Sequence, residues 1–308
     1  MFTDDFDDYR QGVGILATLE RKMASMGQSN QDFLNNVLQK LHGNLEVKFK
    51  KFVDEQIRAI EETKVKIKKR KGIIHFIRVF PQFSTAVENM LTGVDPSLGV
   101  RRMVDREYDR IIKTMFDSLK VIARENPAAV ATGGGASVIT SASTNSADPE
   151  DKEALNFHIL LIENMNHYLE DVDHSRGLEV LDDWRDAAQA ELNEHMGMYI
   201  NAVMRRPLGR LLEYLENIEA QLSNGKTPGM IAAQPSNSKT TFNKVLGGYD
   251  GKEVRKGIET LRKRVEKHFG VDSGATDQDA AQAKGLVGKV LKECERFYGE
   301  VEDRKSVV

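Results

Sequence analysis

The sequence predicts an all-α protein, and three observations support this prediction. Apolar residues recur at spacings of three, four and seven in segment after segment, which is typical of one buried face of an α-helix. No segment alternates apolar and polar residues for long enough to indicate a β-strand. Proline is scarce, with seven in 308 residues, and four of these stand at apparent helix boundaries. We therefore expect long antiparallel helices joined by short loops.

Starts and stops in this periodicity divide the first part of the chain into six segments. In order, they span residues 4–26, 30–42, 44–71, 73–80, 83–91 and 98–125. A break is expected at Gly43, because glycine weakens a helix interior, and another at Pro81, because proline clashes with the preceding turn. The second segment carries a run of apolar residues at helical spacing: Phe33, Leu34, Val37, Leu38 and Leu41.

The stretch from residue 127 to residue 147 differs in composition from everything around it. It is rich in Gly, Ala, Ser and Thr and contains no charged residue. Such a segment buries too little apolar surface to offset the entropy that is lost on ordering. We expect a flexible loop over residues 126–149, disordered in solution at residues 128–147, that joins two long helices.

Residues 154–172 predict the central helix of a bundle, because apolar side chains surround most of the helix. Ile159, Ile162 and Leu169 lie on its predicted buried seam. Five other residues of this helix are polar or ionisable: His158, Glu163, Asn164, Asn166 and His167. Our interpretation is that these groups form hydrogen bonds within the core or occupy the remaining face. The alternative is a metal or acid/base site.

The remainder of the chain predicts two long helical segments, a mixed region with short helices at most, and two further helices. They span residues 178–205, 208–222, 226–251, 252–269 and 280–301. Pro207 either opens a new helix at its first position or kinks a continuous one. On this pattern we divide the chain into a helical bundle over residues 1–206, which includes the flexible loop, and a C-terminal bundle over residues 207–308.

Composition and charge indicate a cytosolic protein. The net charge is −3, so no global field draws the chain to nucleic acid or to an anionic membrane. The single cysteine, Cys294, cannot form an internal disulfide, which favours a reducing compartment. The N-terminus is acidic, unlike a signal peptide, and no apolar run approaches the roughly 20 residues that span a bilayer. The helical pattern starts almost at Met1, as in a fragment of a longer chain.

The motifs of the chain favour neither an enzyme nor a cofactor. Di-iron bundles require Glu-x-x-His pairs, but the spacing of Glu163 and His167 is four residues, and so is that of the other such pairs. The zinc-protease spacing His-Glu-x-x-His is absent. Gly225-Lys226-Thr227 is similar to the end of a phosphate-binding loop, but Ala220 occupies the position of the required first glycine. We expect no catalytic, cofactor or metal site and no small-molecule substrate.

Two clusters of basic residues are the strongest local signals. The first contains Lys64, Lys66, Lys68, Lys69, Arg70 and Lys71. The second contains Arg262, Lys263, Arg264 and Lys267. Each cluster is either a solvated helix end or a contact with anionic lipid headgroups or an acidic partner. Nucleic acid is disfavoured as a partner, because aromatic residues do not interleave with these cations.

Four segments occur in an order that is more specific than any of them alone. They are DREYDRI (105–111), LNFHILLIENMNHYLEDV (155–172), YINAVMRRPLGRLL (199–212) and LRKRVEKHF (261–269). Together they resemble the C-terminal part of the family of exocyst complex component one, the Sec-three subunit, and fungal members in particular. The resemblance covers most of the chain and is weakest at residues 126–149 and 226–250.

The resemblance implies a fold and a function. The fold is an elongated rod of stacked helical bundles, of the tethering-complex (CATCHR-like) type. The function is that of a non-enzymatic part of the exocyst, which binds other exocyst subunits through helical surfaces in docking secretory vesicles. Its location is cytoplasmic and peripheral at plasma-membrane sites of secretion.

Two alternatives to this function stay open. The first alternative is a peripheral module that binds anionic phosphoinositide membrane weakly through clusters 64–71 and 262–268. The second is an enzyme with a site in a helical bundle.

Overall fold

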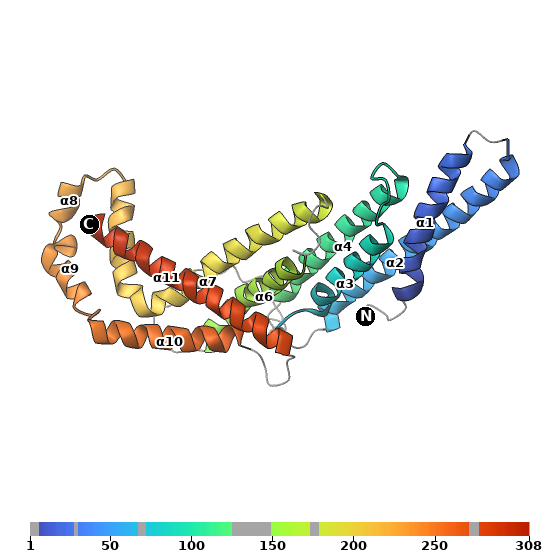
Figure 1. Ribbon diagram of the computed structural model, residues 1–308. Coiled ribbons are helices and arrows are strands. Elements are labelled where there is room, and N and C mark those ends of the chain that lie inside the picture. Colours follow the sequence, from blue (N-terminus) through green and yellow to red (C-terminus); the bar gives the residue numbers. More distant parts are fainter. Residues whose placement is uncertain are drawn as a thin grey trace. The chain divides into compact units, whose positions relative to one another are not determined.

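The computed structural model describes residues 6–27, 30–66, 72–124, 149–172, 179–270 and 277–307 (Figure 1). Within these ranges every regular element is a helix and none is a strand, so the predicted all-α class is confirmed. The predicted flexible loop lies, apart from Pro149, outside the described residues. The chain divides into two compact units, Met1–Leu192 and Asn193–Val308, and each is described by itself.

The first unit is a bundle of α1, α2, α3, α4, α6 and the start of α7. Their bounds are Phe6–Met26, Asp32–Lys66, His75–Met90, Gly99–Arg124, Pro149–Val172 and Glu179–Ser223. Helices α1 and α2 form a hairpin (Figure 1), α2 packs along α4, and α6 packs on both α3 and α4. The predicted ends of the helix at 98–125 agree within one residue with those of α4.

Aromatic side chains from four helices meet at the centre of this unit. Phe80 of α3 stacks on Tyr168 of α6 with ring centroids 6.4 Å apart, and Phe116 of α4 meets Tyr168 edge-on at 5.2 Å. Trp184 of α7 meets Phe116 edge-on at 5.3 Å, and its indole N–H donates to Asp109 at 3.0 Å. Such pairs contribute about 0.5–1.5 kcal/mol each beyond their buried area. Tyr168 is fully buried among these rings, which confirms the predicted central place of α6.

Two predicted helix breaks are wrong, because α2 passes through Gly43 and α3 passes through Pro81. A glycine inside a helix costs only about 1 kcal/mol relative to alanine, which the packing of a helix of 35 residues outweighs. A proline inside a helix costs about 3 kcal/mol or more. In α3, the burial of Phe76, Phe80 and Phe83 offsets this cost, since each buried side chain of this size contributes about 1.5–3 kcal/mol.

The second unit contains the rest of α7 together with α8, η2, α9, α10 and α11. The bounds of these later elements are Pro228–Ala232, Pro235–Asn237, Lys239–Leu246, Gly251–Phe269 and Asp277–Val307. Asp250 caps α10 by accepting hydrogen bonds from Lys252 N at 2.9 Å and Glu253 N at 2.8 Å. Helices α10 and α11 pack on each other, and Tyr199 of α7 meets Phe269 edge-on at 5.1 Å.

Helix α7 runs continuously through Pro207, so this proline opens no new helix. Of the two alternatives that the sequence left open, the continuous helix is therefore the one found. The division between the compact units, after Leu192, and the predicted domain boundary, after Arg206, both fall inside this helix. The domain boundary at 206/207 stays a prediction.

Candidate interaction surfaces

The first predicted basic cluster lies at the C-terminal end of α2. Lys64 is half-buried in the last turn of this helix, and Lys66 is its final residue. Lys68, Lys69, Arg70 and Lys71 lie outside the described residues. The cluster therefore starts at a helix end, where cations interact favourably with the terminal carbonyl groups.

Two polar side chains of α6 fix the chain that follows this cluster. Asn164 accepts from Ile74 N through Oδ1 at 2.7 Å, and its Nδ2 donates to Gly72 O at 3.1 Å and to Leu160 O at 2.8 Å. Glu163 Oε2 accepts from Gly72 N at 3.1 Å. Gly72 has a φ of 81°, in the left-handed region that favours glycine. The central helix therefore holds the backbone immediately beyond the basic cluster.

Other polar residues of α6 form local contacts one turn along the same helix. Asn166 Nδ2 donates to Glu170 Oε1 at 3.1 Å, and His167 Nε2 lies 3.3 Å from Asp171 Oδ2. The predicted hydrogen bonding within the core is confirmed for the buried Asn164, whereas the buried Asn166 bonds to the half-buried Glu170. Within the described ranges of the chain, no group of three or more His, Cys, Asp or Glu side chains could hold a metal ion.

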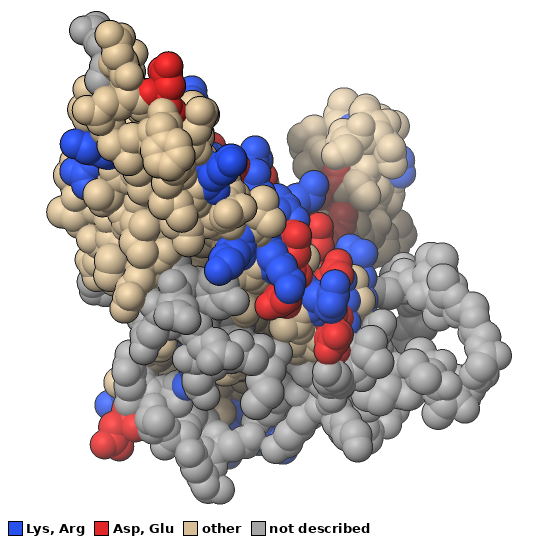
Figure 2. Space-filling model, turned by 90° about the vertical axis from the view of Figure 1, so that its right-hand side faces the viewer, with Lys and Arg blue, Asp and Glu red and all other residues tan. Residues whose placement is uncertain are grey.

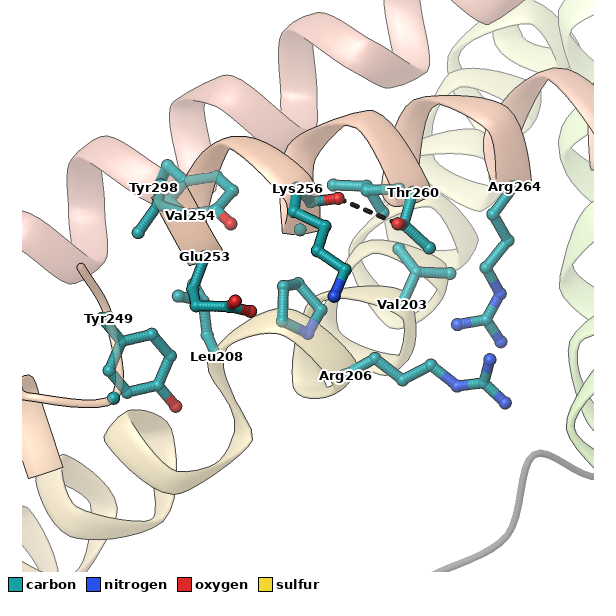
Figure 3. Close-up of a pocket in the computed structure, with 14 residues that line it drawn as sticks. Val203, Arg206, Leu208, Tyr249, Glu253, Val254, Lys256, Thr260, Arg264 and Tyr298 are labelled. Atoms are coloured by element: carbon teal, nitrogen blue, oxygen red, sulfur yellow. Dashed lines mark hydrogen bonds between the residues drawn. The ribbon is translucent and has the colours of Figure 1, made fainter. Parts of the chain in front are cut away.

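The second predicted basic cluster lies on α10, but its four cations do not share one face. Arg262 is exposed and pairs with Glu266 on the next turn, with Nε 2.9 Å from Oε1. Lys263 and Lys267 are exposed and four residues apart, which places them on one face of the helix. Arg264 is half-buried and lines a pocket (Figure 3). The cluster therefore presents one exposed lysine pair rather than a patch of four cations.

The pocket that Arg264 lines has a volume of about 290 Å³ and lies in the second unit, between α7 and α10 (Figure 3). Arg206 of α7 and Lys256 of α10 also line it, together with the carboxylate of Glu253. Its apolar lining includes Val203, Leu208, Val254 and Leu261. The sequence did not single out Arg206 and Lys256, because their approach to Arg264 depends on how α7 packs against α10. The pocket therefore combines an apolar wall with three cations and one carboxylate.

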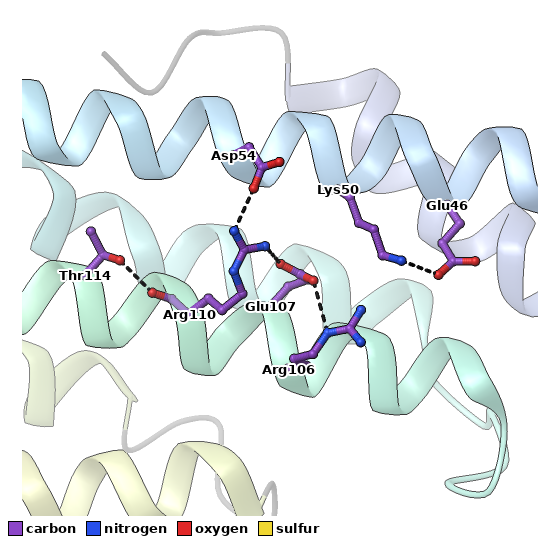
Figure 4. Close-up of polar contacts among 7 residues, drawn as sticks. All are labelled: Glu46, Lys50, Asp54, Arg106, Glu107, Arg110 and Thr114. Atoms are coloured by element: carbon purple, nitrogen blue, oxygen red, sulfur yellow. Dashed lines mark hydrogen bonds and ion pairs between the residues drawn. The ribbon is translucent and has the colours of Figure 1, made fainter.

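One ion pair links α2 to α4 in the first unit, and two further pairs within α4 extend it (Figure 4). Arg110 of α4 places Nη2 2.7 Å from Asp54 Oδ1 of α2, and its Nη1 pairs with Glu107, whose side chain is only 3% exposed. Arg106 Nε lies 3.4 Å from Glu107 Oε1. The hydrogen bond to Asp54, followed by that to Glu107, raises the pKa of Arg110. The pair between Arg110 and Asp54 therefore links two long helices.

Charges of both signs occur together on the described part of the face in Figure 2. Several Lys and Arg side chains gather there, with Asp and Glu side chains beside some of them (Figure 2). A mixed surface of this kind produces a weaker long-range field than a cluster of one sign. None of the described helices combines the length and the apolar composition that crossing a membrane requires.

The family comparison covers almost the whole chain. The family described as "Exocyst complex component Sec3, C-terminal" matches residues 2–305. The mouse (Mus musculus) protein exocyst complex component 1 is 24% identical over 237 residues, which are 77% of this chain and 23% of the mouse protein. The Drosophila melanogaster protein of the same name is 22% identical over 244 residues, or 79% of this chain and 24% of that protein. No solved structure matches.

The matches cover different shares of this chain and of the related proteins. Exocyst complex component SEC3A of Arabidopsis thaliana is 26% identical over 108 residues, which are 35% of this chain and 12% of the plant protein. The chain spans about a quarter of the length of the mouse and fly relatives that it matches. The resemblance inferred from four helical segments is confirmed, whereas a fungal source stays a prediction. With a family match from residue 2 to residue 305, the chain belongs to the family of the C-terminal region of exocyst complex component Sec3.

Proposed function

We propose that this chain is a non-enzymatic part of the exocyst tethering complex, which binds other exocyst subunits through helical surfaces in docking secretory vesicles at the plasma membrane. The family match over residues 2–305 is the observation that carries the proposal. The mouse and fly relatives are named as components of the exocyst complex, and a component must contact at least one other. The cytoplasm, with peripheral recruitment to sites of secretion, is the corresponding location.

The helices of the chain support this role physically. Helix α2 has 35 residues, so it is about 50 Å long at a rise of 1.5 Å per residue. A helix of this length offers side chains along one line, which suits packing against a long helix of another protein. We extend the proposal to the overall architecture, which would be a rod of stacked bundles with domains at 1–206 and 207–308.

The test is binding of the purified chain to each other exocyst subunit, one subunit at a time. The expected result is saturable binding to at least one subunit, measured by an interferometric or calorimetric titration. The proposal fails if no subunit binds the chain at concentrations up to tens of micromolar. Any dissociation constant would then be larger than this concentration.

Membrane binding is the second candidate, and the exposed pair Lys263 and Lys267 is the observation that favours it. Lysines near an anionic leaflet contribute roughly 1 kcal/mol each. The test is co-sedimentation with vesicles that contain phosphatidylserine and a phosphoinositide, compared with neutral phosphatidylcholine vesicles. Reversing the charges of Lys263 and Lys267, or of Lys64, Lys66, Lys68 and Lys69, should then abolish co-sedimentation. Reversing the exposed Lys239 and Lys244 of α9 is the matched control.

A further inference from the structure

The first half of α2 exposes an apolar stripe. Four large apolar side chains of this half have high exposed fractions: Phe33 83%, Leu34 39%, Val37 36% and Leu41 49%. Because successive residues of a helix turn by about 100°, the four side chains fall within one arc of the helix surface. We call these four residues the α2 stripe. Single exposed apolar residues are common on proteins, but a contiguous group of them is typical of an interaction site.

The α2 stripe lies where α4 no longer accompanies α2. Arg110 of α4 pairs with Asp54 of α2, an offset of 56 residues, and the two helices run in the same direction (Figure 4). The first residue of α4, Gly99, therefore lies level with Gly43 of α2. All four stripe residues precede Gly43, so they lie beyond the start of α4.

A hydrogen bond between α1 and α4 also marks the level at which α4 begins. Glu20 of α1 accepts from Val100 N in the first turn of α4 at 2.9 Å. Beyond this level, residues 21–26 of α1 and 32–42 of α2 form the hairpin without α4, and Figure 1 shows these parts of the two helices extending away from α3 and α4. Leu38 of α2, which lies beside the stripe, is half-buried, whereas Phe33 stays almost fully exposed. Two helices alone cannot cover all their apolar side chains, and a third helix completes such an arrangement.

The charges of the hairpin indicate what kind of helix would fit. Between residues 18 and 45 the cations are Arg21, Lys22 and Lys40, and the acids are Glu20 and Asp32. All three cations are exposed, while Glu20 already caps α4. The hairpin that carries the α2 stripe therefore presents three exposed cations and, apart from Glu20, one acid, Asp32. Acidic residues beside the apolar seam of an incoming helix would complement this surface.

We propose that the α2 stripe binds an amphipathic helix of another exocyst subunit, with an apolar seam flanked by acidic residues. This inference rests on the proposed function, because it names the surface through which the chain would contact a subunit. The packing would follow the geometry of two helices side by side, with anchors on α2 at spacings of three and four residues.

The experiment measures the affinity of the full 308-residue chain for each other purified exocyst subunit. The stripe variant carries Phe33→Gln, Val37→Gln and Leu41→Gln, since glutamine is polar and favourable in helices. The control carries Met198→Gln, Met230→Gln and Ile258→Gln, three exposed apolar residues of the second unit. The stripe variant should lose tenfold or more in affinity for one subunit, as expected when interface anchors are removed, while the control stays within twofold. Circular dichroism of both variants should match that of the unaltered chain, because every replaced side chain is exposed.

A second variant tests the acidic flanks of the partner helix. Reversing Arg21, Lys22 and Lys40 to glutamate should weaken the same complex and reduce the dependence of its association rate on salt. Reversing the exposed Lys239, Lys244 and Lys252 is the control. Unchanged or stronger binding after the first reversal would refute the acidic partner.

The outcomes separate this inference from the proposed function. If a subunit binds the unaltered chain and the stripe variant equally well, the inference is overturned and the proposed function stands. If no subunit binds the unaltered chain, the proposed function fails, and the inference fails with it. If the stripe substitutions instead abolish self-association in sedimentation equilibrium, the occupant is a second copy of this chain and the inference is overturned.

Discussion

Asn164 holds Ile74, a residue 90 positions away in the sequence, through a hydrogen bond of 2.7 Å from the Ile74 N–H to the Asn164 Oδ1. The amide nitrogen of the same side chain donates to Gly72 O at 3.1 Å. One side chain thereby pairs backbone groups that no helix satisfies between α2 and α3. The core of the first unit depends on this polar group as well as on apolar packing.

Replacing Asn164 with leucine should destabilise the first unit by about 2–4 kcal/mol. Leucine has a similar volume but forms no hydrogen bond, so the buried Ile74 N–H would lose its partner, at about 1–3 kcal/mol. Gly72 O lies in a partly buried position and adds a smaller cost. Urea unfolding followed by fluorescence measures this loss, because the single tryptophan, Trp184, lies in the first unit.

Asn217→Ala provides the comparison for this experiment. Asn217 is exposed on α7, and it accepts a long hydrogen bond of 3.3 Å from Gln221. Its replacement should change the free energy of unfolding by no more than about 0.5 kcal/mol. An Asn164→Leu chain with the same urea midpoint as the unaltered chain would show that the buried amide contributes nothing.

Replacing Arg110 with methionine should cost about 1–2 kcal/mol. The substitution removes the link to Asp54 and leaves the buried Glu107 carboxylate with Arg106 at 3.4 Å. The cost is moderate because the Arg110 side chain is 42% exposed, and water screens its charge. Urea unfolding at low and high salt tests both the size of the effect and its electrostatic origin.

Lys51→Met is the matched change on the surface of α2, the helix that carries Asp54. The Lys51 Nζ lies 3.9 Å from Glu55 Oε1, and its side chain is 77% exposed. Such pairs contribute close to zero. If the two substitutions had equal effects, the link between α2 and α4 would not differ from an ordinary surface pair.

The stability of the second unit should decrease at alkaline pH. Burial, with a smaller effect of Glu293, raises the pKa of the Cys294 thiol from 9.0 to about 11, and burial also raises the pKa of Tyr199. Between pH 9 and pH 11 the unfolded thiol has lost its proton while the folded thiol keeps it. Unfolding then releases a proton, so the free energy of unfolding falls as pH rises through this window and is unaffected by the thiol below it.

Thermal unfolding followed by circular dichroism from pH 8 to pH 11 measures this decrease. The Cys294→Ala chain should show a shallower decrease over the same range, because the thiol no longer contributes to it. The native thiol should also react slowly with iodoacetamide at pH 8, since the thiolate is the reactive form. Labelling as fast in the native chain as in urea would contradict the raised pKa.

Helical periodicity was enough to predict α4 and α10, because each has one clear apolar face and a clear end. The breaks predicted at Gly43 and Pro81 were wrong because a local propensity of about 1–3 kcal/mol competes with packing that only the folded bundle supplies. Helix propensities describe the free energy that a glycine or proline costs in an isolated helix. Whether the helix breaks depends on the free energy gained by packing against residues that are distant in the sequence.

The surfaces could be predicted less well than the fold. The predicted cluster at 262–268 identified cations on α10, but it gave no sign that Arg264 lies in a pocket with Arg206 of α7. Similarly, the spacing of Phe33 and Leu41 predicts a helix and does not tell whether its apolar face is covered. That depends on where α4 begins relative to α2, a relationship between segments more than fifty residues apart.

Ile162→Ala and His167→Gln together separate a scaffold from a catalyst. Ile162 of α6 is fully buried, so its truncation should cost about 2–5 kcal/mol through lost transfer energy and a cavity. That is a large share of a total stability of about 5–15 kcal/mol, and subunit binding should fall in step with it. His167 lies 3.3 Å from Asp171 on its own helix, and its change to glutamine should cost about 1 kcal/mol and leave binding intact. Urea unfolding and subunit titration on the same two variants give both numbers. A catalytic or metal centre requires the opposite order, in which the histidine change abolishes function in a chain that still folds.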